Sequence, residues 1–266
     1  MNYISKLKKA IKNYKTHLVV GLDSDIKKIP SFFLKYSNPV LEFNKAIIDV
    51  TKNNVAGYKI NTAFYEAEGA KGFETLSKTT AYIPDDHIKI CDAKRGDIGN
   101  TAELYSKAYL NNLNFDAITL NPYMGFDSVE PYIRSKNKYV YIIALTSNQG
   151  HKDFQLLKSN RRHLYEIVID KFLQWSRKDN IGFVMGANHV KEISTLTRNH
   201  PRVSLLIPGI GAQGNDINKL MDNIHNGLFI VNSSRAIIYS AGIDSDKKEF
   251  ESKINESIVN HYLMLL

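Results

Sequence analysis

Short apolar runs recur along the chain and alternate with longer segments of mixed polarity. Each run is rich in β-branched or aliphatic residues, and most of the runs end in polar side chains. Such a run, too short for a typical helix, is typical of a buried strand. The eight runs occupy residues 17–23, 55–61, 87–94, 117–123, 139–148, 182–188, 204–210 and 227–235.

The segments between these runs repeat apolar residues at helical spacing. They predict helices over 40–53, 100–113, 162–178, 189–199 and, closing the series, 249–265. At the N-terminus Ile4, Leu7, Ile11 and Tyr14 recur at the same spacing. We therefore also expect a short amphipathic helix that packs beneath the first strand.

Strict alternation of strands and helices implies parallel strand pairing through right-handed crossovers, which is an α/β fold. Eight repeats within 266 residues favour a closed (β/α)8 TIM barrel over an open doubly wound sheet. No stretch rich in Pro, Gly and Ser separates the chain into halves. We expect a single domain over residues 1–266.

The basic composition calls for an anionic partner. The formal net charge is +8, and a basic surface attracts nucleic acid through counterion release. However, the lysines are spread along the whole chain, no Lys-rich or Arg/Gly block occurs, and the aromatic residues lie inside apolar periodic segments. The sequence favours a locally basic pocket for a small anionic molecule and no nucleic-acid partner.

Cys91 is the single cysteine, so an intrachain disulfide is excluded and a reducing compartment is indicated. We expect Cys91 to be a small buried residue. The N-terminus has no apolar run long enough for a signal peptide, and no segment approaches the length of a membrane span. We expect a cytoplasmic protein without a membrane partner.

Two common nucleotide motifs are missing from the sequence. No G-x-G-x-x-G follows the first strand, and no G-x-x-x-x-G-K-[ST] occurs anywhere. The long irregular segment is 149–160, after the fifth predicted strand. A loop of that length is commonly a lid or binding loop, and a plain surface insertion is nearly as common.

The predicted strands carry polar residues at their carboxyl ends. In a barrel these ends lie on one rim, where active sites of this fold are built. The residues are Asp23, Lys59, Asn61, Asp92, Lys94, Asn121, Thr146 to Asn148, Asn188 and Asn232 to Arg235.

The third strand carries the strongest chemical signal. Side chains alternate along a strand, so Asp92 and Lys94 share the face of Ile88 and Ile90, which points into the barrel. Isolated buried charges are costly, so this pair is either a structural ion pair or part of a site. Lys59 on the neighbouring strand adds a cation, and we favour a site.

The last two connections are suited to phosphate. The segment 208–216 supplies glycines whose backbone N–H groups can converge, and Gln213 can donate from its amide. Arg235 stands at the start of a predicted helix, where the guanidinium and the helix N-terminus both favour an anion. Loops after strands seven and eight are the usual phosphate site of this barrel. Taken alone, the glycines could also be mere tight turns.

These motifs together resemble those of the orotidine 5′-phosphate decarboxylase family. The stretch DAKRGDIGNT, residues 92–101, resembles the Asp-x-Lys-x-x-Asp-Ile signature of the family. GLDSD, YKINTAFYEAEG, TSN, PGIGAQG and NSSR occur in the family's order, from the first strand to the eighth. The Asp-Ile-Gly-Asn-Thr run and TSN resemble its bacterial and parasite branch, although Gln149 stands where that branch often has Pro.

The resemblance implies a catalytic array. It assigns to Lys94 the protonation of C6 of the pyrimidine as carbon dioxide departs. Asp92 would lie near the leaving carboxylate and hold Lys94, and Lys59 would link the array to the ribose. Asp97 and Thr101 would be contributed to the partner's site across the interface of a homodimer.

The resemblance also implies the substrate-binding residues for orotidine 5′-monophosphate (OMP). Asp23 would bind a ribose hydroxyl, Ser147 the pyrimidine ring, and Gln213 with Arg235 the phosphate. Ser234, in the same NSSR motif, would be a further substrate-binding residue. The resemblance implies neither a cofactor nor a metal.

Two other functions stay open at this point. A phosphosugar decarboxylase or aldolase of the same superfamily would use Asp92 and Asp97 to hold Mg²⁺ and stabilise an enediolate. Lys59, placed where a metal-binding acid is expected, argues against it. A barrel without catalysis could instead bind nucleotides or RNA through its basic surface, and the intact charged array argues against that.

A few aromatic and histidine residues invite less specific interpretations. Trp175 falls at helical spacing with Phe172 and is expected in the core. His189 and His200 flank a predicted helix and are expected at the surface or as caps. Tyr123 and Met124 could touch the substrate, but packing is at least as plausible.

Overall fold

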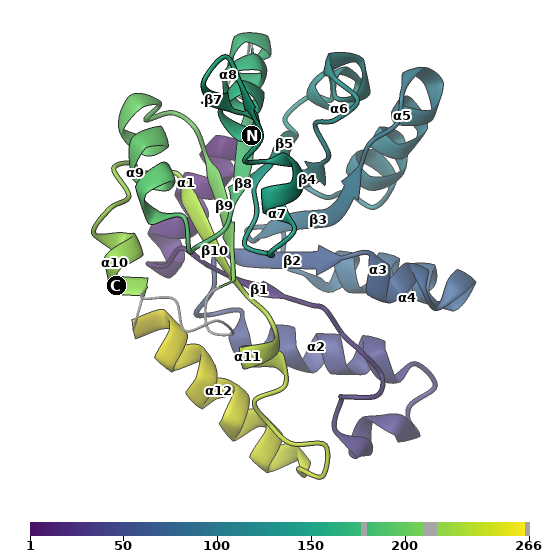
Figure 1. Ribbon diagram of the computed structural model, residues 1–266. Helices are drawn as coiled ribbons and strands as arrows, with labels where there is room; N and C mark the ends of the chain where they lie inside the picture. Colours follow the sequence, from purple (N-terminus) through teal and green to yellow (C-terminus); the bar gives the residue numbers. More distant parts are fainter. Residues whose placement is uncertain (177–179, 210–216, 264–266) are drawn as a thin grey trace. The chain divides into compact units, whose positions relative to one another are not determined.

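The computed structural model describes residues 1–176, 180–209 and 217–263 (Figure 1). Within these residues eight strands are hydrogen-bonded in the order β1-β10-β9-β8-β5-β4-β3-β2 and close into a barrel. The predicted (β/α)8 fold is confirmed, and each predicted strand is present. The strands are β1 (Leu18–Gly21), β2 (Gly57–Asn61), β3 (Ile88–Arg95), β4 (Ala117–Leu120), β5 (Tyr139–Leu145), β8 (Ile181–Met185), β9 (Leu205–Pro208) and β10 (Phe229–Ser233).

The helices expected from periodicity are also present, including the short one at the N-terminus. The helices are α1 (Tyr3–Tyr14), α2 (Pro39–Thr51), α3 (Ala63–Glu66), α4 (Gly69–Tyr82), α5 (Gly99–Ser106), α6 (Glu130–Ile133), α7 (His151–Phe154), α8 (Leu164–Trp175), α9 (Val190–Asn199), α10 (Ile217–Met221), α11 (Arg235–Ile238) and α12 (Lys247–Leu263). The ends predicted at 177–178 and 264–265 lie outside the described residues.

The segment 149–160 is not irregular, contrary to the prediction. It holds the single turn α7 and the strand β6 (Lys158–Ser159), which pairs antiparallel with β7 (Arg162–His163). The tip of this hairpin is Asn160 and Arg161, both with positive φ, 49° and 66°. Arginine is rare in that conformation, so the turn has no clear sequence signal. Whether the segment closes over a site stays a prediction.

The contacts divide the chain into two compact units. The first comprises Met1–Ser5 and Ala93–Val231, and the second comprises Lys6–Asp92 and the chain from Asn232 onward. The boundaries fall inside α1, β3 and β10. The prediction of a single domain over 1–266 stays a prediction.

In the second unit, β1, β2 and the first part of β3 pair in parallel, with Gly21 opposite Lys59 and Asn61 opposite Asp92. Asn38 caps helix α2, because its side chain accepts a hydrogen bond from the Leu41 N–H, and Pro39 occupies the first turn. The α2 helix contacts both α4 and α12.

Aromatic rings fill the contact between α2 and α12 in this unit. Phe33 and Phe43 both lie against Phe250 of α12, with ring centroids 5.3 and 5.9 Å apart. All three rings are buried. Burial of such side chains is the main term that holds the helices on the strands. Cys91, on β3, is buried, as expected.

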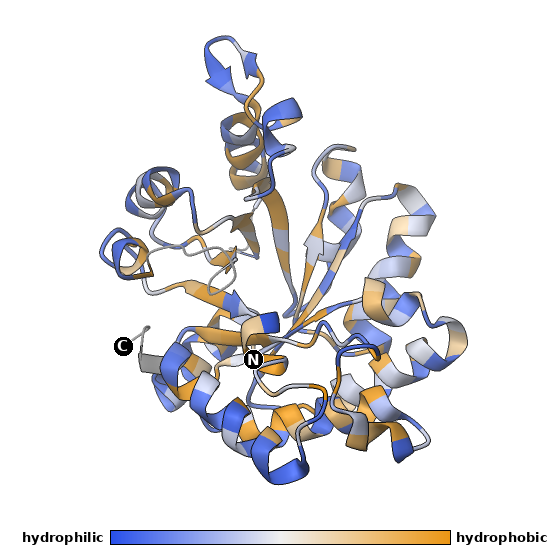
Figure 2. Ribbon diagram, turned by 60° about the horizontal axis from the view of Figure 1, so that its bottom comes forward, coloured by the Kyte–Doolittle hydropathy of each residue, from blue (hydrophilic) through white to orange (hydrophobic). Residues whose placement is uncertain are grey.

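In the first unit, β4, β5, β8 and β9 run side by side, and helices α6 and α8 pack on them (Figure 1). Figure 2 shows the strands mostly apolar and the outward faces of the helices mostly polar. The Tyr3 side chain from the start of α1 belongs to this core. Its hydroxyl lies 2.8 Å from that of Tyr141, which lies 2.8 Å from Ser204 Oγ, and its ring stacks on Tyr139.

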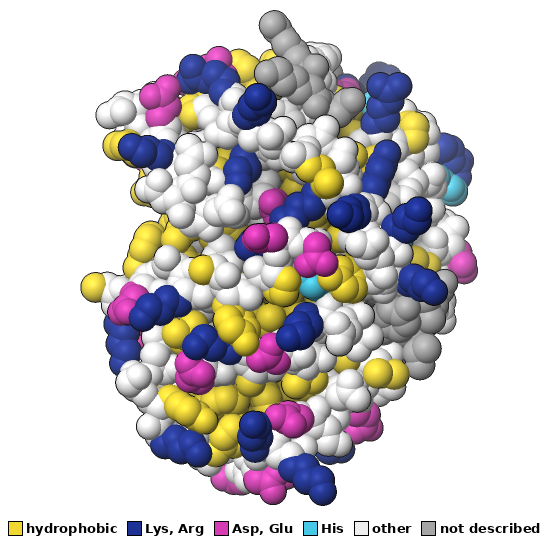
Figure 3. All heavy atoms as spheres, turned by 180° about the vertical axis from the view of Figure 1, so that it is seen from behind, with side chains coloured by type: hydrophobic (Ala, Val, Ile, Leu, Met, Phe, Trp, Pro, Cys, Tyr) yellow, Lys and Arg dark blue, Asp and Glu magenta, His cyan; other side chains and the backbone are white. Residues whose placement is uncertain are grey.

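Charged side chains are interspersed on the face shown in Figure 3. Lys and Arg side chains are scattered there among Asp and Glu, and on this face they do not gather into one basic patch. In the part of the chain that the structure describes, no helix is both long and apolar enough to cross a bilayer.

Candidate active site

Three of the predicted site residues meet at the carboxyl ends of β1, β2 and β3, in the second unit. Lys59 Nζ lies 2.8 Å from Asp92 Oδ2 and 3.7 Å from Asp23 Oδ1. The Lys59 side chain is 5% exposed, those of Asp23 and Asp92 18% and 12%. The first contact is a hydrogen-bonded ion pair, and the second is a charge contact too long for a hydrogen bond. The structure thus brings these three predicted site residues together, and their roles in a site stay a prediction.

The pKa of Lys59 is set by two opposing effects. Burial by itself lowers the pKa of the ammonium, but the negative charges of Asp92 and Asp23 raise it. The net result is a pKa above the ordinary 10.5. Lys59 is therefore a fixed cation between two carboxylates at physiological pH.

Ser234 and Tyr239 hold Asp23 in place. Ser234 Oγ lies 2.8 Å from Asp23 Oδ2 and 3.0 Å from the Gly21 carbonyl oxygen, so its single hydrogen can be donated to either acceptor. The Tyr239 hydroxyl donates to the Asp23 carbonyl at 2.9 Å. A Cβ on Gly21 would lie 2.7 Å from Ser234 Cβ, so β1 needs glycine there. The structure thus places the Ser234 hydroxyl on Asp23, and Arg235 follows as the exposed first residue of α11.

Behind Asp23 lies a buried polar network that the sequence analysis missed. The Tyr65 hydroxyl donates to the Leu22 carbonyl at 2.9 Å and accepts from Asn44 Nδ2 at 2.9 Å. Ser24 Oγ donates to Asn44 Oδ1 at 2.6 Å. Burial raises the pKa of Tyr65, which keeps the hydroxyl protonated as a donor. A sequence signal existed, because Asn44 interrupts the apolar face of α2.

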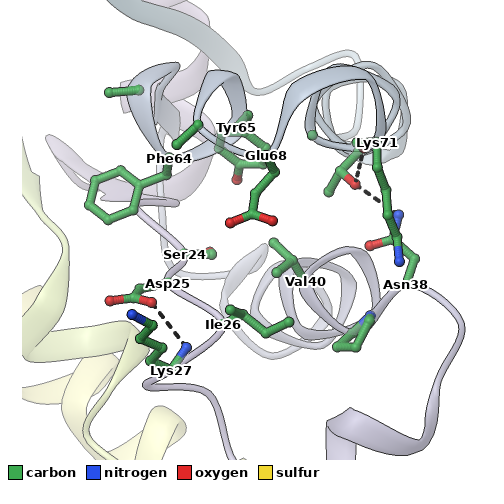
Figure 4. A pocket seen from close by; sticks show the side chains of 15 residues that line it. Ser24, Asp25, Ile26, Lys27, Asn38, Val40, Phe64, Tyr65, Glu68 and Lys71 are labelled. Carbon is green, nitrogen blue, oxygen red and sulfur yellow. Dashed lines mark hydrogen bonds between the residues drawn. The ribbon is translucent and has the colours of Figure 1, made fainter.

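The loop that follows β1, residues 24–27, forms one wall of a pocket of about 390 Å³ (Figure 4). The other walls come from the start of α2, from α3 and from the start of α4. Figure 4 shows the Glu68 carboxylate directed into the pocket, with Phe64 beside it and Val40 facing it. The pocket does not include Asp23, Lys59 or Asp92 in its lining, so it is separate from the charged array.

Lys94, Asp97 and Thr101 belong to the first unit. Lys94 has φ +48°, and its backbone N–H donates to Thr119 Oγ1 at 3.0 Å. A non-glycine residue with positive φ is uncommon and often marks a functional position. Asp97 Oδ1 accepts from the Ile98 N–H at 2.8 Å, and Thr101 is exposed in the first turn of α5.

The end of β3 is fixed by Arg95. Its guanidinium lies over the rings of Tyr105 and Tyr109, 5.2 and 5.4 Å from their centroids. Its Nη2 also donates to the Tyr109 hydroxyl at 2.7 Å, and its carbonyl accepts from Asn121 N–H. These contacts restrain the backbone directly after Lys94.

Of the remaining predicted residues, the structure describes Ser147, Tyr123 and Met124 but not Gln213. Ser147 follows β5 and is half-buried. Gln213 lies outside the described residues. Tyr123 and Met124 are 84% and 45% exposed, so they do not pack in the core of the chain.

Trp175 ends helix α8, and the two histidines flank helix α9. Trp175 lies against the rings of Phe172 and Phe126. His189 and His200 occupy the two ends of α9, as predicted.

Comparison with known proteins decides the family. Residues 16–249 match the model of the "Orotidine 5'-phosphate decarboxylase / HUMPS family". The chain belongs to this family. The resemblance inferred from the motifs is confirmed.

Within the family, the similar proteins carry the decarboxylase name. The orotidine 5′-phosphate decarboxylase of Dehalococcoides mccartyi (strain CBDB1) is 44% identical over 98% of both chains. That of Flavobacterium johnsoniae is 45% identical over 94% of this chain and 93% of its own. The solved structure of Leishmania donovani OMP decarboxylase superposes with a TM-score of 0.80 at 32% identity, covering 97% of this chain and 99% of its own.

Proposed function

We propose that this protein is an orotidine 5′-phosphate decarboxylase, which converts OMP to UMP and carbon dioxide in pyrimidine biosynthesis. The observation that carries the proposal is the Asp23–Lys59–Asp92 array at the ends of three neighbouring strands, in a chain of this family. Lys94 follows Asp92 by two residues on β3. A Mg²⁺-dependent phosphosugar enzyme is disfavoured because Asp92, one of the two carboxylates that would hold the metal, is paired with the Lys59 ammonium at 2.8 Å.

The reaction breaks the bond between C6 of the pyrimidine and the carboxylate carbon. The electron pair stays on C6, carbon dioxide leaves, and the ammonium of Lys94 supplies the proton that forms the new C6–H bond. No carbonyl adjacent to C6 can absorb the negative charge, so roughly 20 kcal/mol of transition-state stabilisation is required. A cation already directed at the developing charge contributes without reorganisation. Asp92 fixes the array through Lys59.

Substrate recognition is assigned to the other predicted site residues. Asp23 binds a ribose hydroxyl, and its buried Oδ1 supports this role because, within the described residues, it accepts no hydrogen bond. Ser147 contacts the pyrimidine, and Gln213 with Arg235 binds the phosphate. Ser234 acts through Asp23, to which it donates.

The proposal includes a homodimer without a cofactor. Asp97 and Thr101 complete the site of the partner subunit, and the partner's copies complete this one. The exposure of Thr101 supports this assignment. The single buried thiol is compatible with work in the reducing cytoplasm.

The function is tested by the fall in ultraviolet absorbance when the purified protein meets OMP in a buffer with EDTA. We expect rapid turnover by the wild type and a fall of kcat of at least about 10³-fold in Lys94→Ala. Lys78→Ala, on the exposed face of α4, is the control and should match the wild type. A folded wild-type protein that leaves OMP unchanged would refute the proposal, and turnover that needs Mg²⁺ would favour the phosphosugar enzyme.

The shared site is tested by mixing two inactive variants. Lys94→Ala and Asp97→Ala should each be inactive alone. In a mixed dimer, one of the two sites has both an intact Lys94 and an intact Asp97 from the partner. We expect mixing and exchange of subunits to restore up to about a quarter of the wild-type activity. If the mixture stays inactive although subunits exchange, Asp97 serves its own subunit.

A further inference from the structure

Gln155 holds the turn that follows β5 through two hydrogen bonds to one residue. The Thr146 N–H donates to Gln155 Oε1 at 2.8 Å, and Gln155 Nε2 donates to Thr146 Oγ1 at 2.9 Å. Thr146 Oγ1 in turn donates to Asn148 Oδ1 at 2.6 Å. Past the strand, the Thr146 amide has lost its ladder partner, and the Gln155 side chain replaces it.

Two histidines bind the carbonyl groups of the same turn. His189 Nε2 lies 3.0 Å from the Thr146 carbonyl oxygen, and His151 Nδ1 lies 2.7 Å from that of Asn148. A carbonyl only accepts, so each of these ring nitrogens carries the hydrogen. The two imidazoles also meet edge to face, with centroids 5.2 Å apart. Three side chains from beyond the turn thus restrain its backbone at Thr146 and at Asn148.

Ser147 lies between Thr146 and Asn148, and its side chain takes no part in these hydrogen bonds. Among residues 1–176, 180–209 and 217–263 its hydroxyl makes no hydrogen bond, although the residue is half-buried. The backbone beside it is confined by Gly186, directly after β8, where an added Cβ would lie 2.9 Å from both the N and the Cβ of Ser147. The position of Ser147 is therefore set by its neighbours and not by contacts of its own hydroxyl.

We propose that Gln155 is a positioning residue for the pyrimidine ring of the substrate. By fixing Thr146 at its amide and its hydroxyl, it presents the Ser147 hydroxyl to the base in a single orientation, with His151 and His189 holding the carbonyl side. This inference rests on the proposed function, in which Ser147 contacts the pyrimidine. A turn that is already ordered binds its ligand without an added entropic cost.

The test compares two inhibitors of OMP turnover that share the sugar phosphate. UMP carries a pyrimidine base, and ribose 5-phosphate has none. In Gln155→Ala we expect the inhibition constant of UMP to rise about 10-fold, while that of ribose 5-phosphate stays within about twofold. Gln155→Glu keeps the acceptor for the Thr146 N–H and loses the Nε2 donor, so it should recover part of the UMP affinity. Lys152→Ala, exposed on α7, is the matched control and should leave both constants unchanged.

The possible results separate the two claims. Unchanged UMP inhibition in Gln155→Ala, or equal weakening of both inhibitors, would overturn the positioning role while leaving the decarboxylase function in place. Absence of OMP turnover in the wild type would overturn the function and this role together. If the alanine variant unfolds, the glutamate variant decides, because only a positioning role predicts selective loss of UMP affinity there.

Discussion

Lys59 is the residue on which the charge balance of the site depends. Its ammonium is buried between two carboxylates and forms a hydrogen-bonded pair with Asp92. Removing one member of a buried ion pair leaves uncompensated charge, which is far more costly than replacing the whole pair. The placement of Asp23 and Asp92 beside each other therefore depends on Lys59.

We expect Lys59→Met to lower the free energy of unfolding by about 3–5 kcal/mol and kcat by at least about 10²-fold. The folded-state pKa of Lys59 is raised, so its stabilising contribution is complete below about pH 10.5 and is lost only as the pH rises through the higher folded-state value. Urea unfolding of both proteins should show a constant difference between pH 7 and 9 that shrinks above about pH 10.5. A difference that already vanishes at pH 8 would contradict this assignment.

Residues whose chemistry is local in sequence were predicted, and those that act through distant partners were not. The sequence indicates Asp23, Lys59 and Asp92, because each is a charged residue at the end of an apolar run. Tyr65 and Gln155 carry no such signal, because each bonds a backbone group outside its own turn of helix, 43 residues away for Tyr65 and nine residues away for Gln155. Only the fold brings these pairs together.

At the scale of elements, the ends of the strands decide where the site residues lie. β5 and β8 pair in parallel, and their register shifts between Ile143 and Leu145, just before the turn at Thr146. Beyond β8, Gly186 passes so close to Ser147 that no side chain fits between them. The geometry of the turn therefore depends on the neighbouring strand as well as on β5.

We expect Gly186→Ala to displace Ser147, raise the KM for OMP about 10-fold and lower the free energy of unfolding by about 1–3 kcal/mol, because the added methyl overpacks a close contact. Steady-state kinetics and urea unfolding measure the two effects. Gly227→Ala is the control, since a Cβ there meets nothing within 4 Å. If both variants behave like the wild type, the close approach of Gly186 to Ser147 affects neither substrate binding nor stability.

The regular elements were predictable because they are long and periodic. The α7 turn and the β6–β7 hairpin were missed, since four-residue and two-residue elements have no measurable period. The helix predicted over 100–113 exists, but its second half, Lys107–Asn112, is π-helical. In a π-helix the hydrogen bonds shift by one residue, which hydrophobic spacing does not reveal.

At the scale of the whole molecule, the net charge of +8 favours an anionic substrate. The face in Figure 3 carries its basic residues dispersed among acidic ones, which gives a broad weak field there and not a track for a polymer. A small molecule with a phosphate and a carboxylate is attracted by such a field from a distance of about a Debye length, roughly 10 Å at 0.1 M salt.

We expect kcat/KM for OMP to fall about 3- to 10-fold when the ionic strength rises from about 0.02 to 0.3 M, because salt screens this attraction. The value of kcat should change little, since the buried array is screened far less. Initial rates at low and saturating OMP measure both constants. A kcat/KM that does not depend on salt would show that net charge plays no part in substrate capture.

The packing of Tyr3 in the core has a consequence for the order in which parts of the protein fold during synthesis. Tyr3 leaves the ribosome well before its partners Tyr139, Tyr141 and Ser204, which lie more than a hundred residues further along the chain. At about 5–20 residues per second, the N-terminal tyrosine waits roughly 10–40 s before Ser204 has been synthesised. During that time the start of the chain carries an undocked aromatic side chain, so docking of the N-terminus is among the last events of co-translational folding.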